Sequence, residues 1–338
     1  MKRLAAFVTA HRIVWPLLIL LALLLITRAY SPNFFSIRIV NGNLFGSLIN
    51  IVRNAAPTLL VALGMNLVIA VRGIDLSVGA VAAIAGAAAS VFVSGSGTPD
   101  AVTTVLTGVA IALAVALAAG VWNGFLVTVV RIQPVVATLV LMMAGRGIAL
   151  LITDQQIVTA SSRPYKMIGG GYWLGIPFSI ILAAAVFALT ALLARKTALG
   201  LLVETVGINP EAARLAGVRA RSITWIVYAF CGLCAGLAGL MITSNSTAAD
   251  PTSTGLYIEL DAILAVVIGG TSLAGGTFSL AGTAVGAFII QTMTTMILTL
   301  GIASEITWVF KAAVVTTVCL IQSAEFRALV VKHVRTAT

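Results

Sequence analysis

The sequence has few charged residues. Only 9% of its 338 residues are Asp, Glu, Lys or Arg, whereas 60% are apolar or aromatic. Soluble domains carry about 25% charged residues, so a soluble fold is excluded. The apolar residues form continuous runs, which also excludes an outer-membrane barrel because its strands alternate apolar and polar residues. We therefore expect an all-α, polytopic membrane helix bundle.

Residues that carry out chemistry are also scarce. Three cysteines are too few for a disulfide-held fold, and the two with redox spacing, Cys231 and Cys234, are expected to pack inside an apolar run. The two histidines, His11 and His333, lie near the chain ends, which argues against an intramembrane enzyme and against a metal site. No G-x-x-x-x-G-K-[ST] motif occurs, so ATP and magnesium would bind a partner subunit. We expect no cofactor on this chain.

Apolar windows predict about ten membrane spans. A helix that crosses the membrane needs about 20 residues, and the chain has ten apolar windows of about this length or shorter. The expected spans are residues 13–27, 57–71, 76–93, 101–121, 134–152, 176–194, 223–243, 260–270, 280–300 and 306–321.

The net charge of +10 is interpreted as membrane topology and not as a nucleic-acid surface. With the N-terminus inside, 13 of the 20 Lys and Arg residues flank spans on the cytoplasmic side. Two lie within spans, and the five expected outside are Arg28, Arg38, Arg53, Arg163 and Lys166. We therefore expect both termini in the cytoplasm and contact with membrane lipid around the bundle.

Two segments each place an aspartate at the start of a helix. On this topology Asp75 opens its span from the cytoplasmic side and Asp261 opens its span from the external side, as an inverted repeat requires. The functional interpretation is a path between the two halves. The alternative is simple N-capping, because carboxylates are favoured at helix N-termini.

Arg146 and Lys311 are the cations expected within spans. An unpaired charge there costs about 2.5–3.5 kcal/mol or more, so acidic partners are expected. The acids at similar depth are Glu259, Asp261 and Glu305. Glu259 and Asp261 are two residues apart on a helix and face different directions, so at most one should point at a given cation. The charges form a structural ion pair or line a path for a sugar or an ion.

Three uncharged amides, Asn66, Asn123 and Gln291, lie within spans or at their ends. They suit hydrogen bonds to sugar hydroxyls. They can equally join helices, where such bonds contribute about 0.6–2 kcal/mol.

The segment 195–222 carries ordered helix signals. Asn209 can cap, Pro210 suits the first helical position and Glu211 suits the N-terminal dipole. Gly217 can stop the helix, and we expect it to have positive φ. The pattern predicts a short helix over residues 210–216. A helix under two turns is marginal alone, so we expect an apposed partner; the alternative is a helix lying on the membrane surface.

The same residues carry a family resemblance. The stretch 211–217, E-A-A-R-L-A-G, resembles the cytoplasmic loop by which ABC importer permeases dock on their ATP-binding subunit. Asn66 and the stretches 73–79, 259–263 and 269–276 resemble the ribose/galactoside branch, and 53–57, 132–134 and 137–147 resemble galactofuranose importer permeases. The coupling residues that this resemblance implies are Asn209, Glu211, Ala212, Ala213, Arg214 and Gly217.

The resemblance implies a single permease domain over residues 1–338 that imports a monosaccharide, such as galactofuranose or a similar aldose, by alternating access. Within it lie a first span and external segment (1–55), a first half (56–194), a cytoplasmic coupling loop (195–222), a second half (223–323) and a cytoplasmic tail (324–338). Its implied partners are an ATP-binding subunit, a second permease (a heterodimer by preference, otherwise a homodimer) and a periplasmic sugar-binding protein, all at a bacterial inner membrane.

The alternative function is an ion-coupled secondary transporter that uses Asp75 or Asp261. The path residues expected on either reading are Asn66, Asp75, Asn123, Arg146, Asp261, Gln291 and Lys311.

Overall fold

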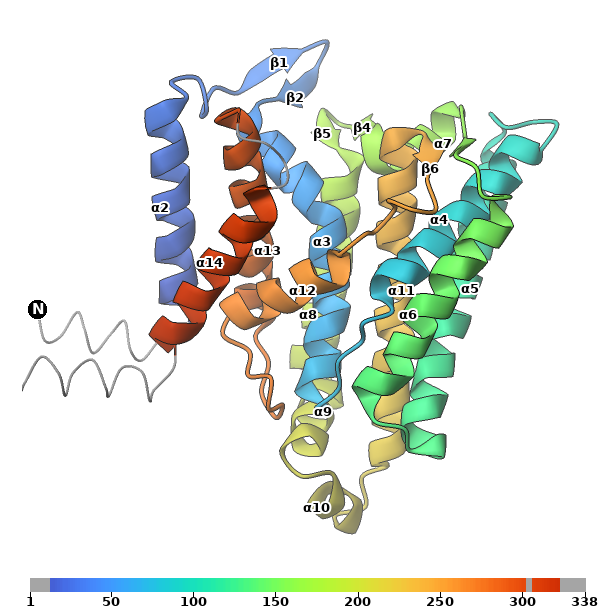
Figure 1. The fold of residues 1–338 in the computed structure, drawn as a ribbon, viewed down its shortest axis with the longest axis vertical. Coiled ribbons are helices and arrows are strands. Elements are labelled where there is room, and N and C mark those ends of the chain that lie inside the picture. The colour runs from blue at the N-terminus through green and yellow to red at the C-terminus, as the bar shows by residue number, and fades with distance from the viewer. Residues whose placement is uncertain (1–12, 302–305, 323–338) are drawn as a thin grey trace, which may run out of the picture.

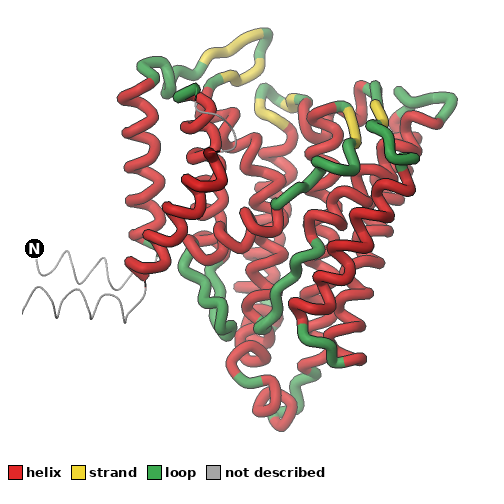
Figure 2. Tube along the Cα trace, viewed as in Figure 1, coloured by secondary structure: helices red, strands yellow, loops and turns green. Residues whose placement is uncertain are grey.

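The computed structural model describes residues 13–301 and 306–322, which form a bundle of helices (Figures 1 and 2). Seven helices of the described residues are long and apolar enough to cross a membrane. They are α3 (Ser47–Ala70), α4 (Val78–Gly95), α5 (Val102–Phe125) with its π-helical continuation η1 (Leu126–Val130), α6 (Pro134–Ile152), α8 (Phe178–Lys196), α11 (Ala220–Ser246) and α13 (Leu280–Thr299).

The remaining helices are shorter, and the strands form three antiparallel pairs. The helices are α2 (Val14–Tyr30), α7 (Arg163–Gly170), α9 (Leu199–Ile208), α10 (Pro210–Leu215), α12 (Ile258–Ile268) and α14 (Ile306–Gln322). The strand pairs are β1 (Arg38–Val40) with β2 (Asn43–Phe45), β3 (Val158–Thr159) with β6 (Ala248–Ala249), and β4 (Tyr172–Trp173) with β5 (Ile176–Pro177).

The expectation of about ten spans is not confirmed. Three of the ten windows correspond to α2, α12 and α14, which have 17, 11 and 17 residues. At ~1.5 Å per residue, α12 is about 16 Å long and covers roughly half of a ~30 Å hydrocarbon core. The apolar window at residues 260–270 was predicted as a full span, because an apolar run does not show where the chain bends.

The two ends of the bundle differ. One end carries α10 and the loop 269–279, and we call it the α10 end; the other carries α7 and the strand pairs, and we call it the α7 end (Figure 1). The first residues of α2 and the last of α14 lie toward the α10 end (Figure 1). Residues 1–12, 302–305 and 323–338 lie outside the described residues, and they include the predicted tail (324–338) and Glu305.

Helix α11 runs through the centre of the bundle, where small residues allow its neighbours to come close. It packs against α3, α4 and α5. A Cβ added to Gly120 on α5 would lie 2.5 Å from the Tyr228 carbonyl oxygen, and one on Gly64 of α3 would lie 2.8 Å from the Cys231 Cα. Such close approach is how membrane helices associate where lipid supplies no hydrophobic drive. Cys231 and Cys234 are buried free thiols in this packing, as expected.

Candidate functional site

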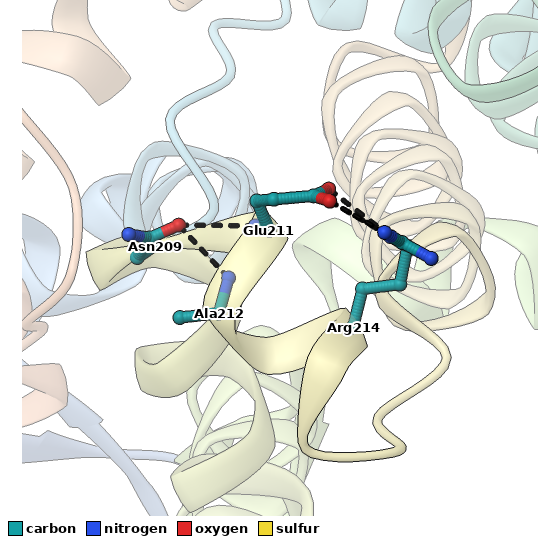
Figure 3. A network of polar contacts seen from close by, with 4 residues as sticks. All are labelled: Asn209, Glu211, Ala212 and Arg214. Atoms are coloured by element: carbon teal, nitrogen blue, oxygen red, sulfur yellow. Dashed lines mark hydrogen bonds and ion pairs between the residues drawn. The ribbon is translucent and has the colours of Figure 1, made fainter.

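Helix α10 is a single, capped helical segment at the tip of the α10 end (Figure 1), and its polar contacts are drawn in Figure 3. The Asn209 side-chain oxygen accepts hydrogen bonds from the backbone N–H groups of Glu211 and Ala212, each at 3.0 Å. Pro210 takes the first helical position, where its missing N–H has no cost. The Glu211 carboxylate pairs with the Arg214 guanidinium at 2.5 Å, and this neighbour lowers the pKa of Glu211. Glu211 therefore stays ionised at neutral pH.

The end of α10 also matches the sequence expectation. The helix stops at Leu215, one residue before the predicted end. Gly217 follows with φ +84°, donates its N–H to the Arg214 carbonyl at 3.0 Å, and is followed by a bond from Val218 N–H to the Ala213 carbonyl at 2.9 Å. This is the left-handed C-terminal motif that favours glycine. Ala213 is the buried residue of α10, whereas Leu215 is 76% exposed.

A groove lies beside α10. It has a volume of about 850 Å³, and its charged lining residues are Arg131, Glu211, Arg214, Arg219 and Arg221. Four cations face one acid, and that acid is already paired with Arg214. The groove is therefore a basic surface that suits an acidic partner.

Helix α10 is tied to the transmembrane core through the end of α9. Arg72, which has φ +63°, donates from Nη2 to the carbonyl oxygen of Ile208, the last residue of α9. The N–H of Gly276 donates to the Ala70 carbonyl at the end of α3 at 2.9 Å, and a Cβ on Gly207 would collide with that same carbonyl. These contacts join the end of α9, which directly precedes α10, to the linker 71–77.

That linker leads to a buried polar cluster. Asp75 is 1% exposed, and its Oδ1 accepts from Ser77 Oγ at 2.6 Å, Ser77 N at 3.0 Å and Asn123 Nδ2 at 3.3 Å. Asn123 Nδ2 also donates to Ser77 Oγ at 2.8 Å, which joins α5 to the start of α4. The structure thus brings Asp75 and Asn123 together. Asp75 is not the N-cap of α4, because the cap position is occupied by Ser77.

Helices α4 and α12 both begin inside the bundle, and their starts touch. Linker 71–77 reaches α4 from the α10 end, and segment 247–257 reaches α12 from the α7 end (Figure 1). A Cβ on Gly79 would lie 2.5 Å from the Gly255 carbonyl oxygen and would overlap the carboxylate of Glu259. Two discontinuous helices thus enter the bundle from opposite ends and meet inside it, an arrangement that transporters built from inverted repeats also use.

Charges from two other helices hold the start of α12. Arg146 on α6 donates from Nη1 to the Thr254 carbonyl oxygen at 2.6 Å. Its guanidinium also interacts electrostatically with the Glu259 carboxylate. Lys311 on α14 contacts both carboxylate oxygens of Asp261, at 2.8 and 2.9 Å. Each expected cation thus faces a different acid, as the two-residue offset predicted. Asp261 lies in the first turn of α12 without capping it.

The last two expected path residues are not joined to these groups by any hydrogen bond among the described residues. Asn66 on α3 is fully buried, and neither of its amide atoms has a partner in the described part of the chain. Gln291 is half-buried on α13.

Sequence reasoning missed three features of the site. These are the Arg72 tie to Ile208, the backbone carbonyl of Thr254 as a partner of Arg146, and the contact of Gly79 with Gly255. The contact of Gly79 with Gly255 had one sequence signal, because a glycine permits close approach of two backbones.

Comparison with known proteins identifies the family. Residues 47–319 match the family described as "Branched-chain amino acid transport system / permease component". The chain belongs to this permease family. The permease is 48% identical over 326 residues to the galactofuranose transporter permease protein YtfT of Escherichia coli K12, covering 95% of this chain and 94% of the relative. It is 42% identical to the fructose import permease protein FruF of Bifidobacterium longum (95% and 90%). It is 37% identical to the ribose import permease protein RbsC of E. coli K12 (91% and 92%).

These relatives confirm the resemblance to ribose and galactofuranose permeases. Each of these three is named as a permease for a different sugar, and the names of FruF and RbsC specify import. The permease is thus a multi-pass membrane protein of a family of transport components.

Proposed function

We propose that this permease is the membrane subunit of an ATP-driven importer of a monosaccharide, with galactofuranose or a similar aldose as the first candidate. The observation that carries the proposal is α10, a capped helix exposed at the tip of the bundle and tied to its core. A helix of under two turns needs an apposed surface, so we expect α10 to contact a partner. The proposed partner is an ATP-binding subunit, which would bind ATP and magnesium.

The coupling surface consists of α10 and the groove beside it. Asn209 and Gly217 fix the two ends of α10, and the buried Ala213 seats it on the bundle. Glu211 and Arg214 pair with each other across the exposed face that also includes Ala212. The arginines of the groove would attract acidic side chains of the ATP-binding subunit.

Motion of that subunit would reach the path through Arg72. A push on α10 moves Ile208, and the Arg72 guanidinium carries this displacement into the linker that holds Asp75. Asp75 and Asn123 are fully buried here, so a sugar can pass them only after the start of α4 separates from α5. Alternating access would therefore act on the junction of α4 with α12.

The path residues fall into two roles on this proposal. The starts of α4 and α12 are positioned by Asp75, Asn123, Arg146, Asp261 and Lys311. The amide atoms of Asn66 form no hydrogen bond within the described part of the chain, so they could bind a sugar hydroxyl. Gln291 on α13 is the other candidate for contact with sugar hydroxyls.

The wider assembly follows from the likeness to importer permeases. A second permease, in a heterodimer by preference, would complete the path, and a periplasmic sugar-binding protein would deliver the sugar. The complex would lie in a bacterial inner membrane with both termini and α10 in the cytoplasm, as the charge distribution favours. Co-purification from the native membrane would identify each partner.

Uptake measurements test the substrate. Cells with and without the gene are given labelled D-galactose in its furanose-containing equilibrium, D-fructose, D-ribose and L-leucine, the last because the family description names branched-chain amino acids. The proposal expects loss of uptake for one sugar on deletion. Loss of leucine uptake alone would contradict it, and uptake that persists without ATP but follows an ion gradient would favour the secondary transporter.

A further inference from the structure

An apolar groove of about 100 Å³ lies between α8 and α11, and we call it the α8/α11 groove. Helix α8 contributes Thr190, Leu193 and Ala194, and α11 contributes Ile223 and Ile226. These residues are spaced three and four apart, so each helix presents one face to the groove. Helices α3 and α9 pack against both α8 and α11 and supply the rest of the wall. The groove therefore belongs to the half of the bundle nearer the α10 end, where α9 lies (Figure 1).

The wall of this groove offers almost no polar group to a ligand. Thr190 is the one residue of the lining with a polar side chain, and its hydroxyl donates to the Val186 carbonyl oxygen at 2.7 Å. A polar ligand would lose its hydrogen bonds to water there without replacement, whereas a hydrocarbon chain has none to lose. The volume is about three times the ~30 Å³ of one water, which suits a segment of an acyl chain.

The groove opens toward the surface that faces lipid. Ile226 is 55% exposed and Leu193 is 36% exposed, so both side chains reach the outside of the bundle. In the apolar stretch of α8 only 17% of the residues are buried, compared with 67% in α11. Because α8 and α11 are both long and apolar enough to cross a membrane, the space outside the groove is hydrocarbon.

Basic side chains stand at one end of the groove. Arg195 and Lys196 are the last two residues of α8, both are exposed, and neither forms an ion pair within the described residues. Thr190 lies only about 9 Å before them along the helix at ~1.5 Å per residue. Arg221 in the first turn of α11 adds a third cation, and Glu204 on α9 is the acid of this region. The rim is therefore basic while the wall is apolar.

An apolar groove with a basic rim matches the two parts of an anionic phospholipid. The phosphate of such a lipid lies at the membrane surface and its acyl chain extends into the hydrocarbon, in the same order as the cations and the lining residues. Basic pockets between transmembrane helices on the cytoplasmic side bind anionic headgroups in this way. A neutral phospholipid would fill the groove equally well but would leave the cations without a partner.

We propose that the α8/α11 groove binds one anionic phospholipid, with an acyl chain in the groove and its phosphate held by Arg195 and Lys196. The lipid would contact α9, the helix that directly precedes α10. Neither cation lines the basic groove beside α10, so the site is separate from the proposed coupling surface. The inference requires only that the chain crosses a membrane, and it does not depend on which solute the permease imports.

The first test measures lipid affinity. The purified transporter with its co-purifying subunits is stripped of lipid and titrated with phosphatidylglycerol or phosphatidylcholine of identical acyl chains, and bound lipid is counted by native mass spectrometry. We expect the wild type to bind one phosphatidylglycerol more tightly than phosphatidylcholine. Arg195→Gln with Lys196→Gln should weaken the phosphatidylglycerol by about fivefold for each cation and leave phosphatidylcholine unchanged.

The matched control removes two exposed cations from one helix at the α7 end. Arg163→Gln with Lys166→Gln changes α7 by the same charge and lies outside the groove. This variant should keep the wild-type affinity for the tightest phosphatidylglycerol. Equal affinity of the wild type for the two lipids, or equal losses in the two double variants, would overturn the proposal.

The second test locates the acyl chain. Phosphatidylglycerol with a photoreactive diazirine in the upper half of one chain should label peptides from α8, α9 and α11. Ile226→Trp, which fills the groove with a larger side chain, should reduce this labelling, whereas Leu106→Trp, at a 62% exposed position of α5, should not. Labelling that avoids these three helices, or that Ile226→Trp leaves unchanged, would overturn the site and leave the proposed function intact.

Discussion

Replacing Gly79 by alanine tests the packed junction of α4 with α12. The added Cβ would lie 2.5 Å from the Gly255 carbonyl oxygen and would overlap Glu259 Oε2. Non-bonded heavy atoms prefer about 3.5–4.0 Å, so the two helix starts must move apart by about 1 Å. Gly255 itself has φ +64° and a backbone contact to Gly79, so the segment 247–257 has little room to adjust.

The expected cost is that of overpacking a tight site. Such insertions cost about 1–3 kcal/mol, and alanine returns about 0.5–1 kcal/mol of helix propensity. We therefore expect Gly79→Ala to destabilise the permease by about 1–2 kcal/mol and to slow uptake more than its stability loss explains. Gly95→Ala is the control at the last residue of the same helix, where no heavy atom lies within 4 Å of an added Cβ.

The assay compares thermal unfolding of both variants with the wild type in one detergent, followed by sugar uptake at matched protein levels. Gly79→Ala should unfold at a lower temperature, whereas Gly95→Ala should not. If both variants behave alike, the close contact between the helix starts is not a constraint, and the reasoning fails.

Three further predictions follow. Asp261→Asn removes the carboxylate that pairs with the buried Lys311 and should lower the free energy of unfolding by about 3–5 kcal/mol. The double variant Asp261→Asn with Lys311→Met should recover most of this loss in a denaturation experiment. A double variant that is no more stable than Asp261→Asn would contradict the ion pair. Arg72→Asn keeps a residue that tolerates positive φ but removes the hydrogen bond to the Ile208 carbonyl. ATPase activity should therefore persist while sugar uptake falls. Uptake at the wild-type rate would show that this hydrogen bond is not needed for transport. In a background without native cysteines, Ser161→Cys should react with an impermeant maleimide in intact cells and Arg219→Cys should not; the reverse would invert the topology.

The helix α10 and its two ends could be predicted from sequence because their signals are local. Asn209, Pro210 and Gly217 each specify their own backbone position, and the structure places all three as predicted. The helical, membrane-spanning class also followed directly from composition, since it depends on totals and not on contacts.

Contacts between distant segments were not readable. An apolar run of 11 residues does not show that α12 stops at half depth, because the bend depends on the packing of segment 247–257 against α4 and α6. The hydrogen bond from Arg53 Nη2 to Asn245 Oδ1 was missed for the same reason, since the two residues are 192 positions apart in the sequence. Ion pairing of Lys311 was predicted, but its choice of Asp261 required the structure.

The central claim is that α10 couples transport to an ATP-binding subunit, and Gly217→Val tests it most directly. Gly217 has φ +84°, and no atom lies within 4 Å of an added Cβ, so valine acts through backbone strain alone, by about 1 kcal/mol or more. Gly217→Asn is the matched control because asparagine tolerates the left-handed conformation.

The measurement is ATPase activity and sugar uptake in vesicles reconstituted with the whole transporter, with the amount of permease in the membrane as reference. We predict that Gly217→Val inserts normally but hydrolyses ATP without matching uptake or loses the ATPase subunit, whereas Gly217→Asn retains coupling. Wild-type uptake per ATP hydrolysed by Gly217→Val, at equal permease levels, would contradict the account.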